Sequence, residues 1–130
     1  MSEAEQSAEI RGIRQIHVPV VDLDRATAFY RDTLGLPHLF TVPPGMSFFQ
    51  CGGIRLMLGV PDYDGLQPGC LVYYDVQDIN AAFARLRDRG ATLPQEPHVV
   101  HRAEGLEIWL AELPDGEGNT IALMSEITTG

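Results

Sequence analysis

Residues 15–36 constrain the fold more strongly than any other stretch of the chain. Aliphatic residues alternate with other residues in the first part of this segment, which predicts a half-buried strand within residues 13–21. Asp22 or Asp24 then supplies an N-cap, because a carboxylate accepts hydrogen bonds from the free amides of a helix's first turn. Apolar residues follow at helical spacing, and Gly35 ends the pattern. The segment therefore predicts a strand that leads into an amphipathic helix.

A weaker copy of the same pattern occurs in the second half of the chain. Residues 71–76 have the composition of a strand, and an apolar helical pattern then runs from Ile79 to a stop at Gly90. Asp78 precedes this second helix as Asp22 precedes the first. The repetition predicts two similar structural units in one chain.

Further strands are expected in each half. The turns between them are rich in Gly and Pro, and Gly52-Gly53 has the length of a two-residue hairpin loop. The expected strands are residues 39–42, 46–51 and 54–59 in the first half, and residues near 97–102, 106–113 and 120–125 in the second. We therefore expect a single domain over residues 11–130, in which module one is residues 11–60, a linker is residues 61–69 and module two is residues 70–127.

The charge of the chain disfavours several classes of function. A net charge of -9 and a pI near 4.7 argue against a nucleic-acid surface, which needs a basic stripe, and against binding to anionic membranes. Residues 1–10 are polar and acidic, so we expect a disordered tail there and no signal peptide. Cys51 and Cys70 are expected to be free thiols, which indicates a reducing cytoplasm.

The motifs of the two halves resemble those of the vicinal oxygen chelate superfamily, also called the glyoxalase/bleomycin resistance protein/dioxygenase family. The residues that carry the resemblance are 20–26, 29–32 and 34–36 in the first half, and 78–82, Leu86, Gly90, 114–116 and 119–121 in the second. The resemblance implies an α+β fold in which two tandem βαβββ modules form a curved, half-open mixed sheet around a cavity, with helices outside. It also implies a small-molecule ligand and a homodimer. The family's usual ending, Asp-Pro-Asp-Gly-Asn, is changed at residues 113–119, which lack the first aspartate and contain two extra residues.

Catalytic members of that superfamily hold a divalent metal with His, Glu or Gln side chains on the first and last strands of each module. Alignment on Asp22 selects Gln15, in place of His17, for the first of these positions. The full set of positions then holds Gln15, Leu56 or Leu58, Leu71 and Ala122. Leucine and alanine offer no oxygen or nitrogen donor to a cation. The resemblance therefore implies a protein without the family's usual metal site, and we expect no cofactor.

A rearranged metal site is the main alternative for the polar residues. His17 lies two residues after Gln15 on the same strand face, and His98 and His101 follow in the second half. Imidazole is a good ligand for Zn, Ni, Mn or Fe, and a displaced site would use Gln15, His17 and His101. Without a metal, Gln15 and His17 would contact a ligand directly, and His17 is a candidate general base.

Other side chains give weaker signals. Glu107 is a candidate acid or base if burial raises its pKa, with an ordinary surface glutamate as the alternative. Trp109, the only tryptophan, either lines the pocket or fills the core. Arg55 on the fourth expected strand is a candidate bidentate contact for a carboxylate or phosphate, but alternation with Ile54 and Leu56 favours a solvated outer face. The residues expected to contact a ligand are Gln15, His17, Phe49, Leu56, Leu71, Tyr73, Trp109, Ala122 and Met124.

These observations leave three functions open. The chain is expected to bind or transform a small organic molecule without the usual metal. The alternatives are a divalent-metal enzyme, either a glyoxalase-like lyase or isomerase or a ring-cleaving dioxygenase, and a structural or regulatory dimer module with no ligand. Neither the identity of the ligand nor the presence of a reaction follows from the sequence, because one fold supports many reactions.

Overall fold

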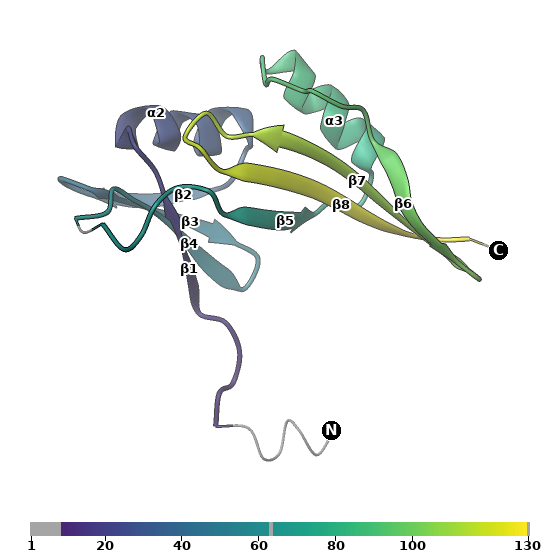
Figure 1. The fold of residues 1–130 in the computed structure, drawn as a ribbon, viewed down its shortest axis with the longest axis horizontal. Coiled ribbons are helices and arrows are strands. Elements are labelled where there is room, and N and C mark those ends of the chain that lie inside the picture. Colours follow the sequence, from purple (N-terminus) through teal and green to yellow (C-terminus); the bar gives the residue numbers. More distant parts are fainter. Residues whose placement is uncertain (1–8, 63, 130) are drawn as a thin grey trace.

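The computed structural model describes residues 9–62 and 64–129 (Figure 1). Residues 1–8 of the predicted acidic tail lie outside the described part of the chain. Two units with the same order of elements follow each other along the chain, as the repeated sequence pattern predicts. None of the helices in the described part is long and apolar enough to cross a membrane.

The first unit is one helical segment on a four-stranded sheet. Its strands are ordered β1-β4-β3-β2, with β1 parallel to β4 and the other neighbours antiparallel. The elements are β1 (Gln15–Pro19), α2 (Leu23–Ala28), the π-helical turn η1 (Phe29–Thr33), β2 (His38–Val42), β3 (Met46–Cys51) and β4 (Ile54–Gly59).

The second unit repeats this arrangement. Its strands are ordered β5-β8-β7-β6, and β5 is parallel to β8 as β1 is to β4. The elements are β5 (Leu71–Asp75), α3 (Ile79–Asp88), β6 (His98–Ala103), β7 (Leu106–Pro114) and β8 (Thr120–Thr128). The α+β fold with two βαβββ modules is therefore confirmed.

The two capping aspartates confirm the sequence repeat at the level of atoms. Asp22 Oδ1 accepts from the backbone N of Arg25 at 3.1 Å, and Asp78 Oδ1 accepts from the backbone N of Ala81 at 3.1 Å. Each bond satisfies an amide that the first helical turn leaves without a partner. The same residue type thus starts the helix in both modules.

Each helix covers one face of its own sheet and forms the core there. Val18 and Leu58 from the first sheet are buried together with Ala26 and Tyr30 from the helical segment. In the second module, strand residues such as Ile121 are buried with helix residues that recur at helical spacing, namely Ile79, Ala82, Phe83 and Leu86. Burial of one large aliphatic side chain contributes about 1.5–3 kcal/mol, so these two faces supply much of the stability.

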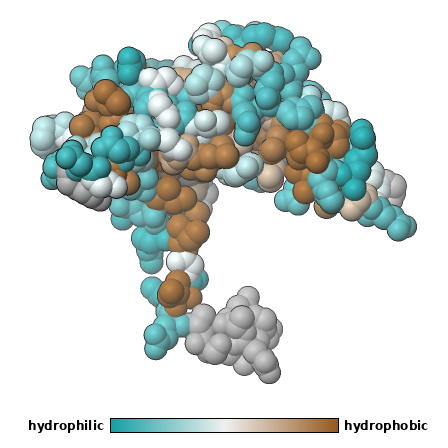
Figure 2. All heavy atoms as spheres, viewed as in Figure 1, coloured by the Kyte–Doolittle hydropathy of each residue, from teal (hydrophilic) through white to brown (hydrophobic). Residues whose placement is uncertain are grey.

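The other face of each sheet is not covered by an element of the described residues. Figure 1 shows α2 and α3 on the same side of the molecule, with the strands beneath them. We call the uncovered sides open face one (β1 to β4) and open face two (β5 to β8). Figure 2 shows an apolar patch on the lower side of the right-hand half, where Figure 1 places β6, β7 and β8. The open faces are therefore the surfaces on which a ligand or a partner could bury apolar area.

Two features differ from the sequence expectation. The helix after Asp22 is α-helical only to Ala28 and continues as a π-helical turn, in which the backbone N of Leu34 donates to Phe29 O at 2.8 Å. The eight strands form two four-stranded sheets, and no bridge joins the sheets within residues 9–62 and 64–129. The modules are joined by side-chain contacts of the β7–β8 loop, so their strand edges need not pair.

That loop holds the start of α2 through the buried carboxylate of Glu117. Glu117 Oε1 accepts from the backbone N of Val21 and of Asp22, both at 2.7 Å, and its other oxygen pairs with Nε of Arg25. The side chain of Glu117 is fully buried. A carboxylate from module two thus satisfies free amides at the entrance to the first helix of module one.

Two further residues of the loop complete this link. Asp115 accepts from the hydroxyl of Tyr30 at 2.7 Å and from the backbone N of Glu117 at 2.7 Å. Asn119 donates to Pro19 O at 2.7 Å and accepts from the backbone N of Gly69 at 2.8 Å. We call Asp115, Glu117 and Asn119 the clasp, because all three are buried and bond across the module boundary or to each other.

Candidate functional site

The strand register decides which side chains share open face one. β1 and β4 are parallel, with Gln15 opposite Arg55 and His17 opposite Met57. Residues on the helix side of these strands, such as Leu56 and Leu58, are buried. Because side chains alternate between faces, Gln15, His17, Arg55 and Met57 all belong to the open face. The first strand and the last strand of the module therefore meet at a polar cluster.

Gln15 and Arg55 form a direct pair at the centre of this cluster. Arg55 Nε donates to Gln15 Oε1 at 2.7 Å, and the amide nitrogen of Gln15 lies 3.8 Å from the sulfur of Met57. The guanidinium carbon of Arg55 also lies 5.9 Å from the centre of the Phe48 ring. A cation at this distance from an aromatic face is attracted by the ring. Arg55 is thus oriented by an amide and by a ring on the uncovered face of the sheet, opposite the buried Leu56.

His17 lies next to this pair and rests on Gly59. Its Nε2 is 3.4 Å from Gly59 O, and a Cβ at position 59 would lie 2.4 Å from the same nitrogen. Glycine is therefore the residue that leaves room for the imidazole. His17 is half-buried on the open face, where its ring can contact a bound molecule.

Two residues expected to line a cavity lie in the core instead. Leu56 is 1% exposed and Phe49 is 0% exposed, and they are paired across β3 and β4 on the helix side of the sheet. Their neighbours Arg55 and Phe48 occupy the open face. The one-residue alternation of a strand accounts for the difference, because a shift of one position moves a side chain to the opposite face.

Open face two carries the expected positions of β5 and β8. Tyr73 is opposite Ala122, and Leu71 lies two residues before Tyr73 on the same face. Tyr73 is 50% exposed and Leu71 is 42% exposed, whereas Ala122 is buried. Met124 is half-buried on this face, opposite Asp75. Leu71, Tyr73, Ala122 and Met124 are thus brought together, but on a different sheet from Gln15 and His17.

Trp109 and Glu107 lie on the helix side of β7. Trp109 packs against the core cluster, and its indole N–H donates to Glu107 Oε1 at 3.2 Å. Arg102 pairs with the other oxygen of Glu107 at 3.0 Å. The hydrogen bond from Arg102 is the main cause that lowers the pKa of Glu107, with that from Trp109 second. This direction is opposite to the raised pKa that a general acid at neutral pH needs.

The histidines of β6 do not complete a metal site with His17. His98 is opposite Leu110 and His101 is opposite Ile108, with an irregularity in the register between the two histidines. Both therefore belong to open face two, whereas His17 belongs to open face one. Within the described residues no three His, Cys, Asp or Glu side chains are grouped so that they could hold a metal ion.

The chemistry of the family positions also does not fit a divalent metal. Leu71 and Ala122 have no donor atom, and the register places a guanidinium, Arg55, opposite Gln15. Gln15 Oε1, the atom that would bind a metal, accepts a hydrogen bond from that cation. A second positive charge beside Arg55 would be repelled. The residues present therefore fit an anion better than a metal cation.

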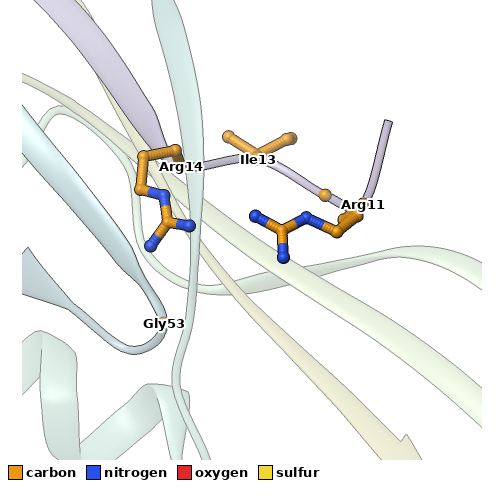
Figure 3. Close-up of a pocket in the computed structure, with 5 residues that line it drawn as sticks. Arg11, Ile13, Arg14 and Gly53 are labelled. Carbon is orange, nitrogen blue, oxygen red and sulfur yellow. The ribbon is translucent and has the colours of Figure 1, made fainter. Parts of the chain in front are cut away.

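Three of the hollows outside this cluster lie beside the start of β1 or where the modules meet. Figure 3 shows the first, a hollow of about 460 Å³ lined by residues 11–14 and Gly53, where the side chains of Arg11 and Arg14 extend into one space. The others lie where the modules meet and have volumes of about 370 Å³ and 120 Å³; both are lined by Cys51, Tyr74 and Asp75 among others. The hydroxyl of Tyr74 is buried there without a hydrogen-bond partner in the described residues.

The two cysteines do not have the character of nucleophiles. Burial raises the pKa of the Cys51 thiol and of the Cys70 thiol, so less thiolate is present near neutral pH. Both are free thiols, as the sequence predicts.

Phe48 and Met57 are the residues of open face one that the sequence did not single out, and the sequence marks Arg55 as a candidate anion contact but favours a solvated face for it. A signal for them was present in the hairpin. The two-residue loop at Gly52-Gly53 pairs Cys51 with Ile54, which fixes Phe48 opposite Met57 and Gln50 opposite Arg55. Leu56 and Leu58, the leucines of β4, mark the side of the strand that faces the helix. Arg55 is next to Leu56 in the chain and therefore lies on the opposite side, the open face.

Comparisons with known proteins agree with this architecture. The family model described as "Glyoxalase/Bleomycin resistance protein/Dioxygenase superfamily" matches residues 12–123. No curated protein matches the chain. A member of the same superfamily from Sphaerobacter thermophilus is 26% identical, covers 91% of this chain and 99% of its own, and has a TM-score of 0.69.

Two other similar structures have more specific descriptions. Lactoylglutathione lyase from Agrobacterium tumefaciens is 22% identical, with 89% of this chain and 94% of that chain covered and a TM-score of 0.72. TnmS3, an antibiotic-binding protein from a Streptomyces species, is 24% identical, with 91% and 98% covered and a TM-score of 0.69. At these identities the likeness concerns the fold, and the two descriptions cover both an enzyme and a binding protein.

Proposed function

The chain belongs to the glyoxalase/bleomycin resistance protein/dioxygenase superfamily, and from this premise we propose that it binds a small organic molecule on its open sheet faces without the usual metal. The bound molecule is either sequestered or transformed, and its own reactive groups decide which. We therefore propose binding alone as the function. The predicted cytoplasmic location remains a prediction.

The pair between Gln15 and Arg55 is the observation that carries this proposal. The superfamily's first metal-ligand position holds an amide whose oxygen accepts from a guanidinium at 2.7 Å. The corresponding position of module two is Leu71, which has no donor. A few polar groups placed beside aromatic and apolar side chains, here Phe48 and Met57, are typical of a small-molecule site.

The candidate contact residues come from both open faces. On open face one they are Gln15, His17, Arg55 and Phe48, and on open face two Leu71, Tyr73 and Met124. The TnmS3 description supports binding as a function of this fold, and the lyase description supports the alternative of an enzyme. The lack of donors at Leu71 and Ala122 favours binding.

We also propose that the protein forms a homodimer. Apolar side chains such as Phe40, Met46 and Tyr73 are exposed on the open faces, at 50%, 37% and 50%. Strands β1 to β4 contain no Asp or Glu, whereas open face two carries Asp75 and Glu112. The two open faces are thus complementary in charge. In a two-fold symmetric dimer, open face one of each copy would contact open face two of the other.

A combined metal and ligand experiment tests the proposed function. Purified protein is analysed for Zn, Ni, Mn and Fe, and its thermal stability is measured with small aromatic, dicarbonyl and antibiotic compounds, with and without a chelator. We expect less than about 0.1 metal per chain and stabilisation by some compounds that the chelator does not change. About one tightly bound metal per chain, or stabilisation that the chelator abolishes, would establish the metal-dependent alternative. No stabilisation by any compound would favour a dimer module without a ligand.

A further inference from the structure

The geometry of Arg55 points to the chemical class of the ligand, an inference that rests on the proposed function. We propose that the Arg55 guanidinium, held by Gln15 and Phe48, binds the oxyanion of a small organic acid, either a carboxylate or a phosphate ester. The apolar part of that molecule would lie against Phe48 and Met57. Open face one would thus place a fixed cationic side chain where relatives use a metal ion.

The surroundings of Arg55 contain no competing acid along the strands. No Asp or Glu occurs between Asp32 and Asp62, although the chain has 18 acidic residues. The backbone N of Arg55 also donates to Arg14 O at 3.0 Å, which continues the parallel pairing of β1 and β4 at this end. A neutral and cationic sheet face in a protein of net charge -9 attracts an anion locally.

The hydrogen bonds of Arg55 leave its forked end available. Its side chain uses Nε for Gln15, and no hydrogen bond of the two terminal nitrogens is found in residues 9–62 and 64–129. Two parallel N–H donors match the two oxygens of a carboxylate or phosphate. The bond to Gln15 and the contact with Phe48 fix the plane of the fork before a ligand arrives.

Other arginines in the described part of the chain are used differently. Arg25, Arg31 and Arg102 each pair with a carboxylate of this chain. Arg87 lies 5.9 Å from the ring centre of Phe83, the same distance that separates Arg55 from Phe48, but it is exposed on α3. Arg89 donates to the backbone oxygen of Thr33, whereas Arg55 donates to a neutral side chain on a sheet whose strands carry no Asp or Glu. Arg87 is therefore a matched control for Arg55.

His17 gives a second contact on the same face. Its ring is half-buried beside the pair, at the position next to Arg55 along the register. A neutral or charged imidazole can donate one hydrogen bond to an oxyanion held by the guanidinium. We therefore expect His17 to contribute less than Arg55, because it adds one bond and Arg55 adds two.

The experiment compares an acid with its uncharged amide. Benzoate, benzamide and phenyl phosphate are titrated into the full-length protein, and binding is followed by backbone amide chemical shifts in NMR. We expect at least one of the two anions to bind about tenfold or more tightly than benzamide, with the largest shifts at residues of β1 and β4. The relative affinities of benzoate and phenyl phosphate distinguish a carboxylate from a phosphate ligand.

Variants then assign the preference to Arg55. Arg55→Met should remove the preference for the anion over benzamide, whereas Arg55→Lys should keep part of it. Arg87→Met should change neither, and thermal denaturation shows whether each variant is folded. Equal binding of anion and amide by the unaltered protein, or a preference that survives Arg55→Met, would overturn the inference and leave the proposed function standing. Binding of none of the three probes on either open face would also overturn the inference, whereas the proposed function fails only if no compound of the broader thermal screen stabilises the protein.

Discussion

Glu117 shows what a single buried residue contributes in this protein. Its carboxylate accepts from two backbone amides at 2.7 Å and from Arg25, whose side chain is 59% exposed. Glu117→Ala leaves both amides without that acceptor, so we expect the free energy of unfolding to fall by about 2–4 kcal/mol. Arg25→Ala removes an exposed partner and should cost less than about 1 kcal/mol. Urea denaturation of the two variants measures the difference, and equal losses would contradict this account.

Tyr30 should make the protein sensitive to alkaline pH. Burial is the main cause that raises the pKa of Tyr30 far above its ordinary value, and the charge of Asp115 is the second. In the unfolded chain the phenol ionises near pH 10, while the folded protein keeps the proton. Above about pH 10 the folded state therefore binds more protons than the unfolded state. The contribution of Tyr30 to the free energy of unfolding is fully present below about pH 10 and decreases as the pH rises above it.

Replacement of Tyr30 isolates this effect. Tyr30→Phe loses the bond to Asp115 and should cost about 1 kcal/mol near pH 7. Between about pH 8 and pH 11, however, the variant should lose about 1.4 kcal/mol less than the unaltered protein, because one tyrosine no longer titrates. The chain contains no lysine, so no lysine ammonium titrates in this range. Parallel urea curves at each pH, with the same pH dependence for both proteins, would refute the assignment.

Among elements, the β1–β4 pair positions the polar cluster through its parallel register. Gly59 ends β4 with ordinary strand backbone, so alanine is allowed there, but its Cβ would lie 2.4 Å from His17 Nε2. Gly59→Ala should therefore displace the imidazole and destabilise the protein by about 1 kcal/mol. His17→Ala should remove most of that cost, which a double-mutant cycle measures as coupling. Additive effects of the two changes would show that His17 does not rest on Gly59.

The elements were easier to predict than their faces. The strands 46–51 and 54–59 and both capping aspartates follow from local turn and capping chemistry, and the structure has them at the same residues. The candidate site depends on which face each strand presents, and that depends on pairing between distant segments. Phe49 and Leu56 were expected on the open face but lie on the helix side. The sequence indicates which residues of β1 share a face, but it does not show that β4 pairs with β1 in the register that places Arg55 opposite Gln15.

The clasp lies beyond prediction for a related reason. Glu117 belongs to the two-residue insertion in the closing loop, and its partners Val21 and Asp22 are more than 90 residues away in the chain. Nothing in the local sequence indicates that a loop glutamate is buried, because glutamate is ordinarily exposed. The insertion therefore has a structural consequence that appears only when the two modules are placed together.

At the scale of the whole molecule, the open faces predict self-association. Phe40 is 50% exposed and stacks on Phe48 with ring centres 4.7 Å apart, which leaves an aromatic surface in solvent. Sedimentation equilibrium should detect a dimer, and Phe40→Asp should raise its dissociation constant about tenfold or more, because a charge would be buried in the interface. Asn80→Asp adds the same charge on exposed α3 and should leave the constant unchanged. If the unaltered protein is a monomer at all concentrations, or if both variants weaken the dimer equally, the open faces are not the interface.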